Sequence, residues 1–258
     1  VVERLCAARP SFMSVTFGAA GGRDTHTADV AELIGRAGVT PLAHQTCIGS
    51  SRAEVAARLA HLRAIGVENV LALRGDLPEG VAAPPPDHYA HASDLVRAIK
   101  EAGGFCVGGA CYPEVHPESR DSAEDIRRLK EKVDAGCDFL TTQMFFDNAL
   151  FYRFLWKARE AGIGVPVVAG IMPITNGRQV ERVRRLSGCY LPHRFMALVD
   201  KFGDKPAAME QAGVAYATDQ IVDLLASGVR AIHVYTMNKP QVAEAILRNL
   251  SEILAAEA

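Results

Sequence analysis

The chain has 258 residues, of which 49% are hydrophobic and 22% are charged, and its formal net charge at pH 7 is −2. This is an ordinary globular composition, and the near balance of charge gives no electrostatic reason to expect nucleic acid or an anionic membrane as a partner. No apolar run approaches the roughly 20 residues that span a bilayer, and no secretory signal pattern opens the chain. We therefore expect a cytoplasmic protein.

Six cysteines are scattered along the chain, and no two of them form a C-x-x-C pair. In a chain of this size the pattern favours reduced thiols of a cytosolic protein over disulfides, and we predict no metal site. Cys47, Cys106 and Cys111 lie in or beside apolar runs, so we interpret them as packing residues without chemistry.

Residues 1–10, VVERLCAARP, have the pattern of the end of a helix. Seven apolar or β-branched runs follow, and most are continuous rather than alternating, which is typical of strands covered on both faces. These predicted strands span residues 12–18, 40–48, 69–76, 105–113, 139–146, 165–173 and 229–238.

Helical patterns separate the predicted strands. Ser51 and Glu54 fit a capping box at the start of one helix. A second helix is predicted over residues 122–136, and Pro240 lies in the first turn of a helix near the end of the chain. The wide gap before the last strand must hold extra helices, for which the candidates are residues 178–188 and 208–226.

The spacing of the strands predicts the fold. The first five strands start 28, 29, 36 and 34 residues apart, and the sixth follows 26 residues later, as successive βα units of a parallel sheet do. Seven units are too many for most doubly wound sheets and one short of a closed eight-stranded barrel. We therefore predict a single (βα)8 TIM barrel catalytic domain over residues 1–258, with its first strand absent from this chain and no regulatory domain. The alternative is an open sheet that begins at Phe12.

In such a barrel the functional groups collect at the carboxyl ends of the strands. Nearly every predicted strand places a polar group there, and these groups are Thr16, His44, Arg74, Asp76, Tyr112, Glu114, His116, Gln143, Tyr235 and Asn238. The triplet Arg74-Gly75-Asp76 would face the cavity of the barrel, with Gly75 letting a flat or anionic ligand approach the backbone.

Several common catalytic patterns are absent from the sequence, namely a nucleophile elbow, H-E-x-x-H, a P-loop and G-x-G-x-x-G. A nucleotide cofactor would therefore not be held in the Rossmann manner. The residues alone favour a large polar ligand with ring and phosphate parts.

Eight segments resemble, in this order, those of bacterial 5,10-methylenetetrahydrofolate reductases: FMSVTFGA, PLAHQTCI, VLALRGDLPEG, HASDLV, CYPEVHPES, LKEKVDAGCDFLTTQMFFD, VVAGIMPITN and HVYTMNK. The resemblance runs from about Ser11 to Ala245. It implies a barrel that binds FAD across the carboxyl ends of its strands. It also implies a ping-pong reaction in which hydride passes from NAD(P)H to the flavin and then to 5,10-methylenetetrahydrofolate, giving 5-methyltetrahydrofolate for one-carbon metabolism and methionine biosynthesis. Relatives of this kind assemble as homo-oligomers, and we expect the same here.

Position by position, the resemblance implies a cofactor site and a substrate site. The implied cofactor-binding residues are Thr16, His44, Arg74, Gly75, Asp76, His91, Ala92, Tyr112, His116, Asp125 and Lys132. The implied substrate-binding residues are Gln143, Gln179, Tyr235 and Lys239. Asp76 would lie near the pyrimidine side of the flavin ring, where its charge tunes the reduced flavin. Gln143 is the second residue to which the resemblance assigns a catalytic role.

Some of these residues also have a plainer interpretation. Thr16 and Gln143 could be polar caps of strand ends, and His116 could be an ordinary loop residue. Asp125 and Lys132 are seven residues apart, so both can point from one helix face, either toward the cofactor or into solvent.

The sequence departs from the family in three places. The family's first strand carries a glutamate that acts as general acid, and because no such segment is present here, no residue is assigned that role; Glu114 is interpreted as structural. His91 stands where the family often has tyrosine. Val183 replaces an aromatic residue of some relatives, and Lys239 replaces an arginine, which removes the bidentate fork toward a carboxylate.

Two other functions stay open at this point. A relative with the same barrel could use another pterin, or another electron donor supplied through a partner subunit. A catalytically silent flavin-binding or assembly subunit is the second, and the absent glutamate is its only support. The sequence does not distinguish NADH from NADPH or indicate a preference for polyglutamate length.

Overall fold

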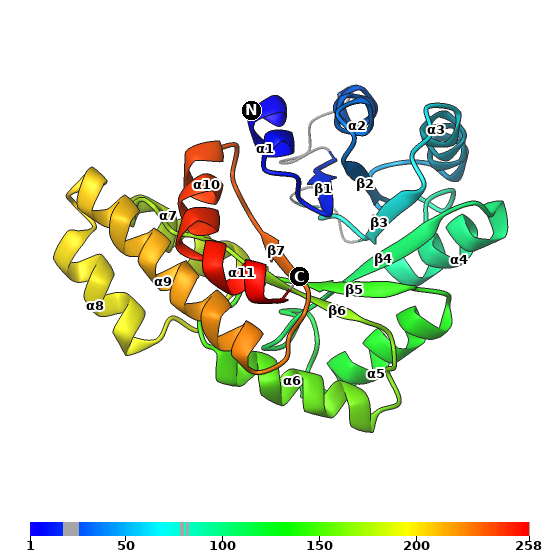
Figure 1. Ribbon diagram of the computed structural model, residues 1–258. Helices are drawn as coiled ribbons and strands as arrows, with labels where there is room; N and C mark the ends of the chain where they lie inside the picture. Colours follow the sequence, from blue (N-terminus) through cyan, green and yellow to red (C-terminus); the bar gives the residue numbers. More distant parts are fainter. Residues whose placement is uncertain (18–25, 78–79, 81–82, 258) are drawn as a thin grey trace. The chain divides into compact units, whose positions relative to one another are not determined.

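The computed structural model describes residues 1–17, 26–77, 80 and 83–257, so Gly18, the last residue of the first predicted strand, lies outside the described residues. The strands are β1 (Phe12–Val15), β2 (Thr40–Thr46), β3 (Asn69–Leu73), β4 (Cys106–Cys111), β5 (Phe139–Thr142), β6 (Val167–Ile171) and β7 (Ile232–Val234). The helices are α1 (Val2–Ala7), α2 (Thr27–Arg36), α3 (Arg52–Ala64), α4 (Ala92–Ala102), α5 (Ser122–Asp134), α6 (Asn148–Glu160), α7 (Gly177–Ser187), α8 (His193–Phe202), α9 (Pro206–Ala226), α10 (Pro240–Asn249) and α11 (Ser251–Glu257) (Figure 1).

The strands follow one another across the sheet in chain order, from β1 to β7. The pairs β1–β2, β2–β3, β3–β4 and β6–β7 are all parallel. A doubly wound open sheet reverses its strand order at a switch point, whereas consecutive parallel strands joined by helices are the order of a (βα)8 barrel. The predicted fold class, α/β with successive βα units of the TIM-barrel type, is confirmed.

Most predicted elements are present, although the strands end earlier than the apolar runs do. β3 stops at Leu73 and β5 at Thr142, so the polar residues that follow them lie on connecting segments. The helices expected over 178–188 and 208–226 are α7 and α9. The helix α8 was not predicted, although Pro192 at its N-cap and Gly203 at its C-cap are ordinary boundary signals.

The chain divides into two compact units. The N-terminal unit consists of Val2–Ala110 and Arg128–Leu140, and the C-terminal unit consists of Val1, Cys111–Arg127 and Thr141–Ala258. The expectation of one catalytic domain over residues 1–258 stays a prediction.

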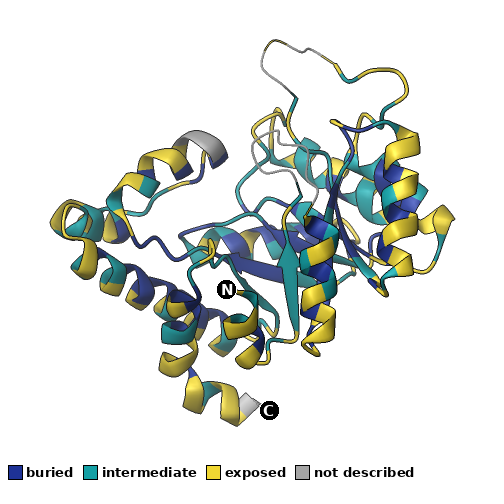
Figure 2. Ribbon diagram, turned by 90° about the horizontal axis from the view of Figure 1, so that it is seen from above, coloured by how far each residue is buried: buried dark blue, intermediate teal, exposed yellow. Residues whose placement is uncertain are grey.

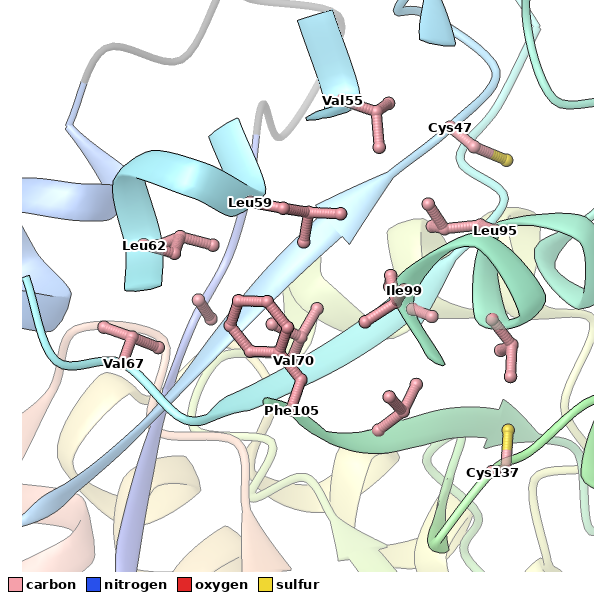
Figure 3. Close-up of a cluster of buried hydrophobic side chains, with 14 of the residues drawn as sticks. Cys47, Val55, Leu59, Leu62, Val67, Val70, Leu95, Ile99, Phe105 and Cys137 are labelled. Atoms are coloured by element: carbon pink, nitrogen blue, oxygen red, sulfur yellow. The ribbon is translucent and has the colours of Figure 1, made fainter. Parts of the chain in front are cut away.

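The core of the N-terminal unit lies between its helices and strands. Val55, Leu59 and Leu62 recur on one face of α3, and Leu95 and Ile99 on one face of α4. Figure 3 shows these side chains gathered with residues of the strands, and all of them are buried. The start of α3 is fixed as predicted, because Glu54 N–H donates to Ser51 Oγ at 3.2 Å and Ser51 N–H donates to Glu54 Oε2 at 2.8 Å.

The core of the C-terminal unit is organised by α9, the longest helix with 21 residues. Its glycine, Gly213, has no room for a side chain, since a Cβ there would lie 1.9 Å from the carbonyl oxygen of Ile174. The helix therefore packs directly on the backbone that follows β6. Phe195 of α8 packs against Phe146 with the ring centroids 4.7 Å apart and the ring planes tilted by 31°, and it extends this core.

Burial follows the amphipathic patterns in both units. In Figure 2 the helices show exposed residues on one side and buried or intermediate residues on the other, as helices that cover a sheet should. None of the helices in the described residues combines the length and the apolar character needed to cross a membrane. Cys47 and Cys111 are buried as predicted, but Cys106 is exposed, so its interpretation as a packing residue is wrong.

Candidate functional site

In the N-terminal unit, three neighbouring strands bring predicted cofactor residues to one edge. His44 of β2 pairs in register with Leu71 of β3, and Val15, the last residue of β1, pairs with Ala43. Thr16 follows β1 and is exposed, and its carbonyl oxygen accepts a 2.9 Å hydrogen bond from Thr27 Oγ1 at the start of α2. Because these strands are parallel, Thr16, His44 and the segment after β3 lie toward the same end of the sheet, where the strands finish.

The Arg74-Gly75-Asp76 segment is held by backbone hydrogen bonds to the segment that follows β2. Ile48 N–H donates to the carbonyl oxygen of Arg74 at 2.9 Å, and Cys47 N–H donates to the same oxygen at 3.2 Å. Arg74 Nε donates to the carbonyl oxygen of Gly75 at 3.2 Å. Asp76 comes next, and its side chain is exposed. The carboxylate is thus presented to solvent from a fixed backbone.

Gly75 has a structural reason to be glycine. Its φ is +82°, in the left-handed region, and a Cβ at this position would lie 3.2 Å from Thr46 Cβ and 3.3 Å from Ile48 Cγ2. The missing side chain therefore lets the two strand-end segments pack together. Close approach of a ligand to the Gly75 backbone stays a prediction.

His91 and Ala92 lie at the start of α4. His91 is the N-cap residue, and its N–H donates to Asp94 Oδ2 at 3.3 Å. The loop before it is tied to the end of β2 by His88, whose Nδ1 lies 2.9 Å from the carbonyl oxygen of Ile48. Sequence analysis missed His88, because no local pattern relates it to a residue 40 positions away.

Lys132 reaches the end of β4 from α5. Its Nζ donates to the carbonyl oxygen of Ala110 at 2.6 Å. The aliphatic part of the side chain passes over Gly109, where a Cβ would lie 3.0 Å from Lys132 Cδ and 2.9 Å from Cys137 Sγ. The absence of a side chain at Gly109 therefore leaves room for the aliphatic part of Lys132. Burial raises the pKa of the Cys137 thiol to about 11, so that thiol is a packing group.

In the C-terminal unit, three predicted cofactor residues follow β4 closely. The rings of Tyr112 and His116 meet edge to face with centroids 4.6 Å apart. His116 Nδ1 accepts a 3.1 Å hydrogen bond from Glu118 N–H, which orients the imidazole. Asp125 lies in the first turn of α5, and its Oδ1 accepts from Ser119 Oγ at 3.1 Å. Tyr112 and His116 therefore contact each other, and Asp125 is held by the loop that joins β4 to α5.

A cavity of about 350 Å³ lies beside this loop, with Tyr112 and Asp125 in its wall. Its wall also holds Glu114 and the cations Arg153 and Lys157 of α6, which sequence analysis did not select as site residues. Lys157 Nζ donates to Ser122 Oγ at 2.8 Å. The cavity therefore combines charges of both signs with an apolar wall that includes Ile126, Leu150 and Phe154, and it suits a ligand with both polar and apolar parts.

Glu114 acts as a tie between two segments of the C-terminal unit. Its Oε2 accepts a 2.6 Å hydrogen bond from the N–H of Tyr190, 76 positions along the chain. Burial raises the pKa of the Glu114 carboxyl, and the nearby charge of Asp147 acts in the same direction, while the Tyr190 hydrogen bond partly offsets them. These contacts agree with the structural interpretation of this residue.

Gln143 and Tyr235 lie at the ends of β5 and β7. Gln143 N–H donates to the carbonyl oxygen of Cys111 at 2.7 Å, and its own Oε1 accepts from Met144 N–H at 3.0 Å. Tyr235 OH donates to the carbonyl oxygen of Thr142 at 2.7 Å, and burial raises the pKa of its phenol. The ring lies over Gly170, where a Cβ would be 2.8 Å from Tyr235 Cε2.

The other two predicted substrate residues share one partner. Lys239 Nζ donates to Thr175 Oγ1 at 2.7 Å, and Thr175 N–H donates to Gln179 Oε1 at 3.1 Å. Thr175 is only 5% exposed and was not selected by sequence analysis. Val183, one turn further along α7, is 4% exposed and packs in the core with Phe195, so it presents little surface to a ligand.

Among the described residues, no group of three or more His, Cys, Asp and Glu side chains is arranged to hold a metal ion. Hydrogen-bond donors and acceptors are the groups that each of the two units presents. In the N-terminal unit they are strand-end groups on a fixed backbone. In the C-terminal unit they are side chains tied to one another.

Comparison with known proteins agrees with the resemblance seen in the motifs. The family described as "Methylenetetrahydrofolate reductase" matches residues 1–251. The chain is 34% identical to the 5,10-methylenetetrahydrofolate reductases of Pectobacterium carotovorum subsp. carotovorum and of Escherichia coli (strain K12), in each case over 96% of this chain and 83% of the relative. It is also 34% identical to methylenetetrahydrofolate reductase (NADH) 1 of Zea mays, over 98% of this chain and 45% of the relative. The chain belongs to the methylenetetrahydrofolate reductase family of oxidoreductases.

Proposed function

We propose that this chain catalyses the FAD-dependent reduction of 5,10-methylenetetrahydrofolate to 5-methyltetrahydrofolate, with NAD(P)H as the hydride donor. The two half-reactions would follow one another in a ping-pong sequence, in one-carbon metabolism and methionine biosynthesis. Family membership over residues 1–251 supports the reduction of the folate. The name of the maize relative, which includes NADH, supports a nicotinamide donor and favours NADH as the first one to test.

The Arg74-Gly75-Asp76 segment carries the flavin part of this proposal. A carboxylate that tunes a ring must stand at a fixed place, because the strength of its field depends on distance. Two backbone hydrogen bonds to the carbonyl oxygen of Arg74 and the packing of Gly75 on Thr46 supply that rigidity. Asp76 is exposed beside them, so its charge is available to a bound group.

The residues present fit FAD by the chemistry of their donors. Arg74, Lys132 and the imidazole of His116 are suited to phosphate and hydroxyl oxygens, and the Tyr112 ring offers a stacking surface. The residues proposed to contact FAD are Thr16, His44, Arg74, Gly75, Asp76, His91, Ala92, Tyr112, His116, Asp125 and Lys132. When bound, FAD would supply the hydride-carrying chemistry that amino-acid side chains lack.

The substrate side is proposed to consist of Gln143, Gln179, Tyr235 and Lys239. The Lys239 ammonium would meet a carboxylate of the folate, as a point charge rather than a bidentate fork. Tyr235 donates its hydroxyl to the Thr142 carbonyl oxygen, so it offers the ligand a ring face more than a proton. Two residues, Asp76 and Gln143, are proposed to be catalytic. We further propose that residues 1–258 form one catalytic domain and work in the cytoplasm as a homo-oligomer.

An absorbance experiment on the purified protein tests the whole proposal. A flavin band should be present or should appear on addition of FAD, bleach when NADH is added without oxygen, and return when 5,10-methylenetetrahydrofolate follows. A protein that takes up no FAD would overturn the cofactor assignment. A flavin that bleaches but does not return with the folate would point to a different acceptor.

A further inference from the structure

Thr175 is buried between two of the proposed substrate residues, and we infer that it is the positioning residue that orients both of them toward an oxygen-bearing group of the substrate. Its Oγ1 accepts the 2.7 Å hydrogen bond from Lys239 Nζ, and its N–H donates the 3.1 Å hydrogen bond to Gln179 Oε1. This inference rests on the proposed function, because it names the group of the substrate that those residues meet.

The hydrogen bonds decide which end of each side chain faces a ligand. The Gln179 oxygen is engaged by Thr175 N–H, so the amino end of the carboxamide is the one that it presents. Lys239 has three ammonium hydrogens and gives one to Thr175, and within the described part of the chain it has no carboxylate partner. Both residues therefore present N–H donors and a positive charge, which selects a carboxylate or carbonyl oxygen.

The backbone on both sides of Thr175 is held by contacts with neighbouring elements. Gly213 of α9 packs against the preceding residue, with its Cβ position 1.9 Å from the Ile174 carbonyl oxygen. The next residue, Asn176, caps α7 by accepting a 2.9 Å hydrogen bond from Arg178 N–H. Gln179 follows in the first turn of α7, so the threonine and the glutamine are carried by one rigid corner.

Lys239 approaches Thr175 from a strained turn. Met237 and Asn238 have φ values of +49° and +59°, and Lys239 N–H donates to the Thr236 carbonyl oxygen at 2.9 Å, which together make a type I′ turn. Residues other than glycine seldom adopt this conformation, although asparagine tolerates it better than most, and they persist where the surroundings hold them. The hydrogen bond from Lys239 to Thr175 is one contact that holds this turn.

Three substitutions in the full chain test the role. Thr175→Val keeps the shape but removes the hydroxyl acceptor, and Thr175→Ser keeps the hydroxyl. Thr218→Val is a matched control, since Thr218 Oγ1 in α9 donates to the Val214 carbonyl oxygen at 2.8 Å and lies outside the proposed site. Each variant is assayed for NADH-driven reduction of a quinone, which needs no folate, and for NADH-driven reduction of 5,10-methylenetetrahydrofolate.

Thr175→Val should raise the KM for the folate roughly tenfold, the size of one hydrogen bond to a charged group, with quinone reduction unchanged. Thr175→Ser should stay within about twofold of the parent, and Thr218→Val should match the parent in both assays. Equal losses in both assays, or a Thr175→Val that behaves like Thr218→Val, would overturn the inference. A parent protein that reduces the quinone but never the folate would instead overturn the proposed function.

If Thr175→Val does not fold, Thr175→Ala takes its place. A double-mutant cycle then combines the Thr175 substitution with Lys239→Met. The effect of either substitution on the KM for the folate should largely disappear in a Lys239→Met background, because both changes remove the same hydrogen bond. Full additivity of the two changes would contradict a positioning role for Thr175.

Discussion

The two units hold their candidate residues by different means. In the N-terminal unit, the Arg74 carbonyl oxygen accepts backbone hydrogen bonds from Cys47 and Ile48, so the main chain defines the position of the segment. In the C-terminal unit, Lys239 and Tyr235 are held through their side chains, by Thr175 and by the carbonyl oxygen of Thr142. The position of the Arg74-Gly75-Asp76 segment should therefore respond to a change of backbone at Gly75, whereas the position of the Lys239 side chain should respond to loss of the Thr175 hydroxyl.

Gly213→Ala should have the largest effect on stability. The new Cβ would lie 1.9 Å from the Ile174 carbonyl oxygen, so α9 would have to move away from the backbone that carries Thr175. We expect a loss of about 3 kcal/mol or more in the free energy of unfolding. Urea denaturation measures it.

Gly35→Ala in α2 is the matched control for that change. Gly35 is also helical, but a Cβ there would lie 4.0 Å from its nearest neighbour, Pro41 Cγ, and would fit without a clash. This substitution should stabilise the protein by roughly 0.5–1 kcal/mol through helix propensity. A Gly213→Ala protein as stable as the parent would contradict close packing of α9 against the backbone next to Thr175.

Acid should weaken the C-terminal unit through His233. Burial lowers the pKa of this histidine from 6.5 to about 4, so between about pH 6.5 and pH 4 the unfolded chain binds a proton that the folded chain does not. Stability is therefore lost as the pH falls through this window, by at most about 3 kcal/mol. Glu114, whose folded pKa is raised, acts in the opposite direction.

His233→Phe isolates the histidine contribution. It removes the titrating group and keeps an aromatic ring against Tyr235, whose centroid is 4.8 Å from that of His233. The free energy of unfolding of this variant should depend less on pH over the same window, whereas the exposed His61→Gln should follow the parent. An unchanged pH dependence in His233→Phe would contradict the assignment.

Gly75→Ala should displace the Arg74-Gly75-Asp76 segment of the N-terminal unit. The substitution places a side chain in the left-handed region and 3.2 Å from Thr46 Cβ, so we expect a loss of about 2 kcal/mol and weakened flavin binding. Gly38→Ala is the matched control, since its φ of +78° is similar but nothing lies within 4 Å of its Cβ position. Flavin retention equal in the two variants would show that the strand-end packing does not matter to the cofactor.

Asp76→Asn should have the smallest structural effect, because its side chain is exposed. Because the proposed function places Asp76 beside the flavin, loss of this negative charge should slow hydride transfer to the folate roughly tenfold while bleaching by NADH is preserved. Anaerobic stopped-flow spectroscopy separates the two half-reactions. Asp29→Asn, a change at an exposed carboxylate of α2, should leave both rates unaltered; equal behaviour of the two variants would remove Asp76 from the catalytic group.

Local patterns in the sequence determined the seven strands, the capped start of α3, the α/β fold class and the family. Apolar runs, caps and short motifs act over a few neighbouring residues, which is why they are readable without coordinates. The missed helix α8 also had such signals, at Pro192 and Gly203. Both boundary residues were therefore present in the sequence but were not interpreted as the ends of a helix.

Only the tertiary structure decided how the candidate residues are held. The partner of Lys239 is Thr175, 64 positions away, and His88 contacts Ile48 across 40 positions. Gly75 is glycine because of Thr46, and Gly213 because of Ile174. A sequence shows which side chains exist and what local backbone they favour, but a hydrogen bond or a close approach between distant segments forms only when packing brings them within a few ångströms of each other.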